Sequence, residues 1–131
     1  MLVRFYSGSK VNYVDDHNRF AGFDMGQQCC EVAHHGVYDL KGRKLEFICK
    51  DNRWPDLFFA DKEPIFDKGE VMRDLVGTDL FRYVDEGGMV RFELVDQYRR
   101  PAGWLVFFNG HNGWYTHGGE YNLKPGTVFG L

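Results

Sequence analysis

The chain has 131 residues, of which 44% are hydrophobic and 17% aromatic, and its formal net charge is −3. This length predicts a single domain over residues 1–131, and the aromatic content excludes an intrinsically disordered chain. The acidic balance argues against a nucleic-acid-binding protein. The chain has no run of about 18 apolar residues, so we expect no membrane partner.

The three cysteines are Cys29, Cys30 and Cys49. An odd count, with polar residues and Gly8 too close to the N-terminus for a signal peptide, indicates a reduced, cytoplasmic protein. Free cysteines are most often small buried apolar residues, and this is the interpretation we favour for all three.

The first half of the chain predicts strands. Residues 3–6 and 11–14 are β-prone and flank the turn-like segment 7–10, which is typical of a β-hairpin. A further strand is expected over Arg19–Met25. Residues 43–50 alternate between apolar and charged side chains, as in a half-buried strand.

The middle of the chain is less regular. Asp51–Asp67 has no firm period and is interpreted as a long irregular connection, where functional sites often lie. Lys68–Val76 is the convincing helical stretch, because Val71 and Leu75 are four residues apart and Gly77 would end the helix.

The last third of the chain gives the clearest strand pattern. Val90, Phe92 and Leu94 alternate with charged residues, and the apolar run 104–108 suits a central strand. With a third strand over 114–117, these segments predict an antiparallel meander. We therefore expect an α+β domain, mostly antiparallel β, with a C-terminal β-meander and one or two short helices.

Two segments, Gly26–Val32 and Asn109–Glu120, resemble those of a family of small uncharacterised bacterial and phage proteins. That family carries a Gly-Gln-Asp-Cys-Cys-Glu-like segment and a C-terminal Asn-Gly-Tyr-Tyr-Ser-His-Gly-like segment. Here Gln28, Trp114 and Thr116 replace the usual Asp, Tyr and Ser. The resemblance implies a shared fold and a phage or mobile-element origin, and it supplies no catalytic roles.

The segment Asn109–Gly119 is the first candidate site, because a glycine-rich turn there is followed by adjacent aromatic residues. The aromatic rings would stack on a planar ligand, while amides and imidazoles would contact its polar edge. The candidate ligand-binding residues are Asn109, His111, Asn112, Trp114, Tyr115 and His117. The structural alternative is a tight hairpin with Gly110 and Gly113 at positive φ and Trp114 in the core.

The second candidate is a metal- or thiol-dependent enzyme built on Cys29 and Cys30. Its further residues would be His34, His111 and His117. The spacing of Cys29, Cys30, His34 and His35 fits no standard zinc template, and adjacent residues of a strand point to opposite faces. A Cys–His–Asn arrangement with Asn109 or Asn112 as the orienting residue has no local signature either.

The favoured hypothesis is a non-enzymatic binding protein of phage or mobile-element origin without a cofactor. It would sequester a small, nucleotide-like ligand or block a host protein. Exposed aromatic strands would also allow a homo-oligomer. The metal- or thiol-dependent enzyme is the alternative.

Overall fold

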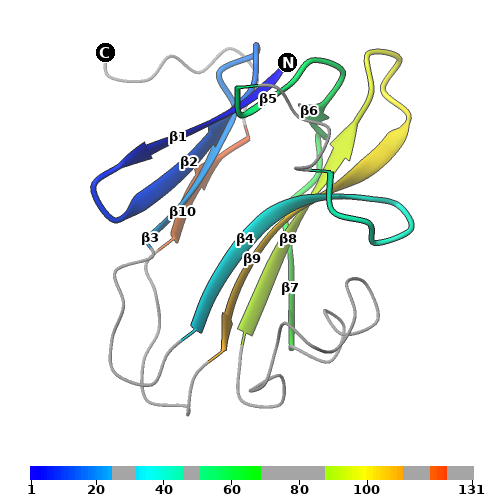
Figure 1. Cartoon of the computed structure of the whole chain (residues 1–131). Coiled ribbons are helices and arrows are strands. Elements are labelled where there is room, and N and C mark those ends of the chain that lie inside the picture. Colours follow the sequence, from blue (N-terminus) through cyan, green and yellow to red (C-terminus); the bar gives the residue numbers. More distant parts are fainter. Residues whose placement is uncertain (25–31, 46–50, 69–87, 111–118, 124–131) are drawn as a thin grey trace.

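The computed structural model describes residues 1–24, 32–45, 51–68, 88–110 and 119–123. Within these ranges the chain forms β-strands in two sheets, with almost no helix, and all the strand pairs are antiparallel (Figure 1). The mostly antiparallel β class predicted from the sequence is thus confirmed, whereas the short helices stay a prediction.

Sheet A has, in the described part of the chain, five strands in the order β10-β3-β2-β1-β5. They are β1 (Leu2–Ser7), β2 (Lys10–Val14), β3 (Phe20–Asp24), β5 (Arg53–Trp54) and β10 (Gly119–Asn122). The predicted hairpin is the β1–β2 pair, which closes at Ser7 and Lys10. Gly8 occupies this turn with a φ of 61°, a conformation that glycine adopts without steric cost.

Sheet B has the order β4-β9-β8-β6. Strand β7 also pairs with β8, at residues 88–91, whereas β6 pairs with it at Leu94 and Val95. Its described strands are β4 (Val32–Asp39), β6 (Phe58–Phe59), β7 (Ile65–Lys68), β8 (Gly88–Val95) and β9 (Pro101–Gly110). The apolar run 104–108 lies in β9, which β4 and β8 flank on both sides. The prediction of a central strand is confirmed.

The expected C-terminal meander is correct only for β8 and β9. Both edges of β9 are already paired along the strand, so the strand that follows cannot continue a meander beside it. The next described strand, β10, pairs instead with β3 of sheet A. The predicted strand over 114–117 lies outside the described residues.

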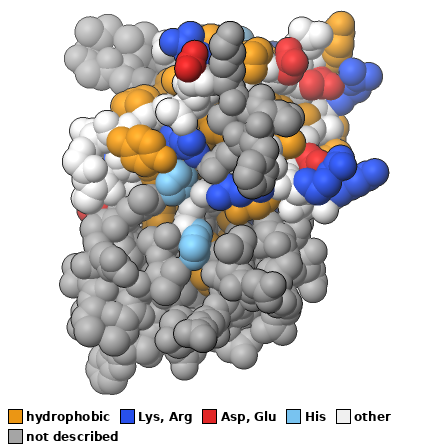
Figure 2. All heavy atoms as spheres, in the orientation of Figure 1, with side chains coloured by type: hydrophobic (Ala, Val, Ile, Leu, Met, Phe, Trp, Pro, Cys, Tyr) orange, Lys and Arg blue, Asp and Glu red, His pale blue; other side chains and the backbone are white. Residues whose placement is uncertain are grey.

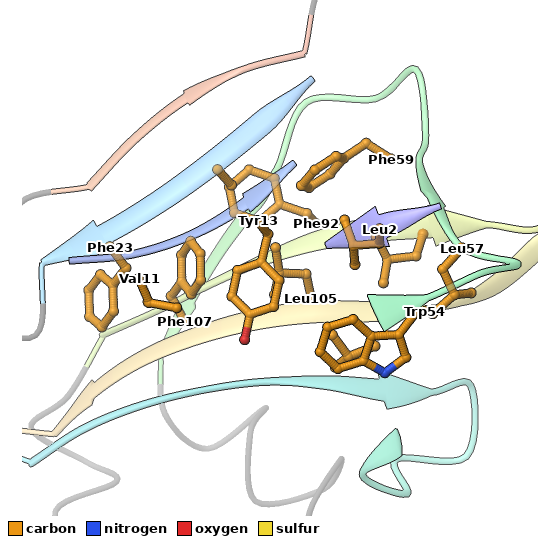
Figure 3. Packing of buried hydrophobic residues seen from close by; sticks show 13 residues of the cluster. Leu2, Val11, Tyr13, Phe23, Trp54, Leu57, Phe59, Phe92, Leu105 and Phe107 are labelled. Atoms are coloured by element: carbon orange, nitrogen blue, oxygen red, sulfur yellow. The ribbon is translucent and has the colours of Figure 1, made fainter. Parts of the chain in front are cut away.

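The hydrophobic core lies between the two sheets, and each sheet contributes large side chains to it (Figure 3). Phe23 of β3 and Phe107 of β9 stack with ring centroids 5.1 Å apart and an interplanar angle of 8°. Fully buried Tyr13 contacts the rings of Phe107 and Trp54 at 5.8 and 6.0 Å. Burial of such aromatic surface is the main term that holds the sheets together.

The prediction of an irregular connection over Asp51–Asp67 is wrong in part, because this segment contains β5, β6 and the start of β7. Two-residue strands are too short for an alternating pattern, so sequence periodicity does not detect them. Lys68 ends β7, and residues 69–76 of the predicted helix lie outside the described ranges. Of the predicted strand 43–50, Lys44 bridges Tyr38, while residues 46–50 are not described.

The described residues include no helix long and apolar enough to cross a membrane.

Candidate functional site

Most of the residues predicted to bind a ligand lie outside the described ranges, namely His111, Asn112, Trp114, Tyr115 and His117. Asn109 is described as part of the backbone of β9, where it pairs with Ala33 and Gly88. Strand β9 includes Gly110 as well, so the strand runs further than the turn predicted over 109–113 allows.

Of the alternative enzyme site, the structure describes His34 but not Cys29 or Cys30. Burial lowers the pKa of His34, and the nearby positive charge of Lys44 lowers it further. His35, the next residue of β4, faces the core, where its Nδ1 lies 2.6 Å from the hydroxyl of Tyr13. The described ranges contain no group of three or more His, Cys, Asp or Glu that could hold a metal ion.

The strands place the described ends of the two sequence motifs side by side. Val32, which follows the cysteine segment, pairs with Gly110, and Phe23, which precedes it, pairs with Gly119. Strands β3 and β10 are thus neighbours in sheet A, and β4 and β9 are neighbours in sheet B (Figure 1).

Three turns, which follow strands β2, β4 and β8, share one hydrogen-bond pattern. These turns, here called the Asp–Arg turns, are Asp15–Arg19, Asp39–Arg43 and Asp96–Arg100. In each, the Oδ1 atom of the first residue accepts hydrogen bonds from the backbone N–H groups two and four residues later. The fourth residue has a positive φ of 60°, 81° and 61°, respectively. Such a pattern closes a short loop between antiparallel strands.

Two of the Asp–Arg turns also close with an ion pair between their own ends. The Arg43 Nε lies 2.7 Å from Asp39 Oδ2, and the Arg100 Nε lies 3.0 Å from Asp96 Oδ2. The backbone N–H of Arg100 is the main cause that lowers the pKa of Asp96. Burial alone would raise the pKa of Asp39, but the hydrogen bonds from Arg43 and Lys41 outweigh it and the pKa is lowered.

The first Asp–Arg turn uses its two charged side chains differently, because both are buried. Asp15 Oδ2 accepts a hydrogen bond of 3.0 Å from the backbone N–H of Phe59 instead of binding its own arginine. The Arg19 guanidinium donates to the Phe59 carbonyl at 2.7 Å and to the carboxylate of Asp61. The β2–β3 turn of sheet A is thereby fixed to β6 of sheet B.

A pocket of about 350 Å³ opens where these segments meet. Its walls come from the β2–β3 turn (His17 and Arg19), from residues 58–62, and from the β8–β9 hairpin end. Cavities that bind small molecules have volumes of roughly 300–1,000 Å³, and they are apolar with a few placed polar groups. Phe58 faces the His17 ring at 5.9 Å, and together with Val95 and Pro101 it gives the apolar part of this lining.

Two sets of ion pairs lie at the pocket. Asp61 pairs with Arg19 and, at 3.5 Å, with Arg99. Lys62 Nζ lies 3.0 Å from Glu93 Oε2. On the face shown in Figure 2, acidic and basic side chains of the described residues likewise lie next to one another.

Sequence analysis missed this pocket, although two signals for it were present. The spacing of an aspartate four residues before an arginine recurs at all three Asp–Arg turns. The prediction that functional sites lie in the segment 51–67 included residues 58–62 of the pocket. The pairing of Arg19 with Phe59 and Asp61 spans some forty residues of sequence and has no local signature.

No protein-family model matches this chain, and no curated protein or solved structure matches it either. The resemblance to the family of bacterial and phage proteins therefore stays a prediction.

Proposed function

We propose that the protein is a non-enzymatic binding protein and that the pocket beside Arg19 takes a small, nucleotide-like ligand. The observation that carries this proposal is a cavity of about 350 Å³ that joins an aromatic wall to a buried arginine. A volume of this size lies in the range of small-molecule sites, and Phe58, Val95 and Pro101 give the lining an apolar part beside its charged groups.

The two sides of the pocket suit the two parts of such a ligand. The rings of Phe58 and His17 offer planar surfaces on which a base could stack. Arg99 and Lys62 have exposed side chains at the same pocket, and both carry positive charge. Arginine and lysine groups bind phosphate oxygens through charge-assisted hydrogen bonds.

The ion pairs within the pocket hold its charged groups in place. Arg19, Asp61, Lys62 and Glu93 are each engaged with an opposite charge. Groups held in this way have fixed positions from which they can orient a ligand.

The test is thermal unfolding in the presence of nucleosides and nucleoside monophosphates. A ligand at one hundred times its Kd should stabilise the wild-type protein by about 2.7 kcal/mol. We expect Phe58→Ala to lose this ligand-dependent gain, because the variant removes the stacking surface. Phe66→Ala is the matched control, since Phe66 is 70% exposed and does not line the pocket.

A second pair of variants separates this pocket from the site predicted by the sequence. If Trp114→Ala and Asn112→Ala abolish the ligand-dependent gain while Phe58→Ala retains it, the ligand binds at the segment 109–117 and not at the pocket. A wild-type melting temperature that no member of the nucleoside and nucleotide panel raises would contradict the proposed function itself.

A further inference from the structure

One carboxylate lies between two guanidinium groups at the pocket. Asp61 binds Arg19 through one oxygen and lies 3.5 Å from Arg99 through the other. The side chain of Arg19 is only 7% exposed, whereas that of Asp61 is 53% exposed. Of these two partners, only Asp61 has a direct path into solvent.

Arg19 is held in place without the help of Asp61. The backbone N–H of Arg19 donates to Asp15 at 3.1 Å, and its Nη1 donates to the Phe59 carbonyl at 2.7 Å. Its Nε is buried and has no hydrogen-bond partner among the described residues. The guanidinium is therefore a positioned cation, and Arg19 lines the wall of the pocket.

We infer that Asp61 fills the anion position of an empty pocket, and that the ligand brings a phosphate monoester that replaces it between Arg19 and Arg99. This inference rests on the proposed function and names the chemical group that the pocket recognises. The Asp61 side chain needs only to rotate towards solvent, because its surface is already half exposed.

The charges favour this exchange. A phosphate monoester carries a charge of about −1.5 to −2 near neutral pH, more than the single charge of a carboxylate. Arg19 and Arg99 flank the position directly. Lys62 lines the same pocket, paired with Glu93, and Asp96 adds a further negative charge to the lining. The planar, forked guanidinium matches the geometry of phosphate oxygens and can bind two of them at once. A buried arginine keeps a counter-charge throughout, so the exchange avoids an unpaired buried cation.

Asp61 then competes with the phosphate group for Arg19 and Arg99. A carboxylate attached to the same chain acts at a high effective concentration, so it weakens the binding of an external anion. Removing its charge should therefore tighten the binding of a nucleotide but leave the binding of the corresponding nucleoside unchanged.

The experiment measures the binding affinities of adenosine monophosphate and adenosine for the full chain by titration calorimetry. We expect Asp61→Asn to bind adenosine monophosphate roughly tenfold more tightly than wild type, the size of effect that a close like charge produces. The asparagine amide oxygen can still accept a hydrogen bond from Arg19, so the variant should fold. Glu120→Gln is the matched control, because it removes the same charge from an exposed ion pair with Lys10.

Two variants and two compounds give distinct outcomes. Arg99→Gln should weaken adenosine monophosphate binding and leave adenosine binding unaltered. If both compounds bind and Asp61→Asn changes neither affinity, the inference about Asp61 is overturned and the proposed function stands. If neither compound binds to any variant, both are overturned for this class of ligand.

Discussion

Asp15 and Asp96 begin turns with the same backbone hydrogen bonds, yet only Asp15 is buried. The carboxylate of Asp15 accepts hydrogen bonds from the backbone N–H groups of His17, Arg19 and Phe59. Phe59 belongs to the other sheet. Removing a partner from a buried N–H group costs far more than removing one that water can replace.

This difference predicts unequal effects of the same substitution. Asp15→Ala should lower the free energy of unfolding by roughly 3 kcal/mol, since it leaves buried N–H groups unsatisfied near a buried arginine. Asp96→Ala, the matched control, should lower it by about 1 kcal/mol, the usual value of an exposed turn or cap. Urea unfolding measures both values, and equal losses would refute the role given to Asp15.

At the scale of the strands, the register of β4 and β9 depends on a close backbone approach. A Cβ atom at Gly103 would lie 2.3 Å from the carbonyl oxygen of Tyr38. That oxygen belongs to the backbone of the paired strand and cannot move without disturbing the pairing. Gly8 differs, since a Cβ atom there would have no neighbour within 4 Å.

We therefore expect Gly103→Ala to lower the free energy of unfolding by about 3 kcal/mol, the upper part of the usual range for overpacking. Gly8→Ala should cost about 1 kcal/mol, because only the positive φ of residue 8 opposes the new side chain. Chemical unfolding of the two variants provides the comparison. A loss at Gly103 no greater than that at Gly8 would contradict the steric argument.

The strands also show which parts of the fold can be predicted from the sequence. The hairpin of β1 and β2, strand β3, the alternation in β8 and the central position of β9 were all predicted, because each is encoded in a local run of residues. The short strands β5 and β6 were missed, as was the pairing of β10 with β3. These depend on contacts between distant segments, which no local pattern records.

The pocket illustrates the same limit. Arg19 was placed at the start of a predicted strand, and residues 58–62 were interpreted as part of an irregular connection. Arg19 and Asp61 meet only because the two sheets pack together. The segment 109–117 was predicted as the site from its residue composition.

At the scale of the whole molecule, pH should act on stability in two separate ranges. The pKa of His34 is lowered from its usual 6.5, so the unfolded chain binds a proton more readily than the folded one. The contribution of His34 to the free energy of unfolding is then fully present above about pH 6.5, and it declines as the pH falls below that value. The lowered pKa values of Asp39 and Asp96 add a second decline below about pH 3.8.

His34→Gln should remove the upper decline, which for one proton is at most about 1.4 kcal/mol per pH unit. The measurement is the free energy of unfolding from pH 7.5 to 5.0 in wild type, His34→Gln and the control His17→Gln. A wild-type curve that is flat over this range, or one that His17→Gln alters as much, would contradict the prediction.

The central place of β9 in sheet B has a consequence for synthesis on the ribosome. Strand β4 ends at Asp39, whereas its partner β9 begins only at Pro101, so β4 leaves the ribosome well before β9 is made. At a translation rate of about 5–20 residues per second, β4 waits several seconds for that partner. An unpaired strand is the kind of segment that chaperones bind, so slowing translation between these two strands should lengthen chaperone association with the nascent chain.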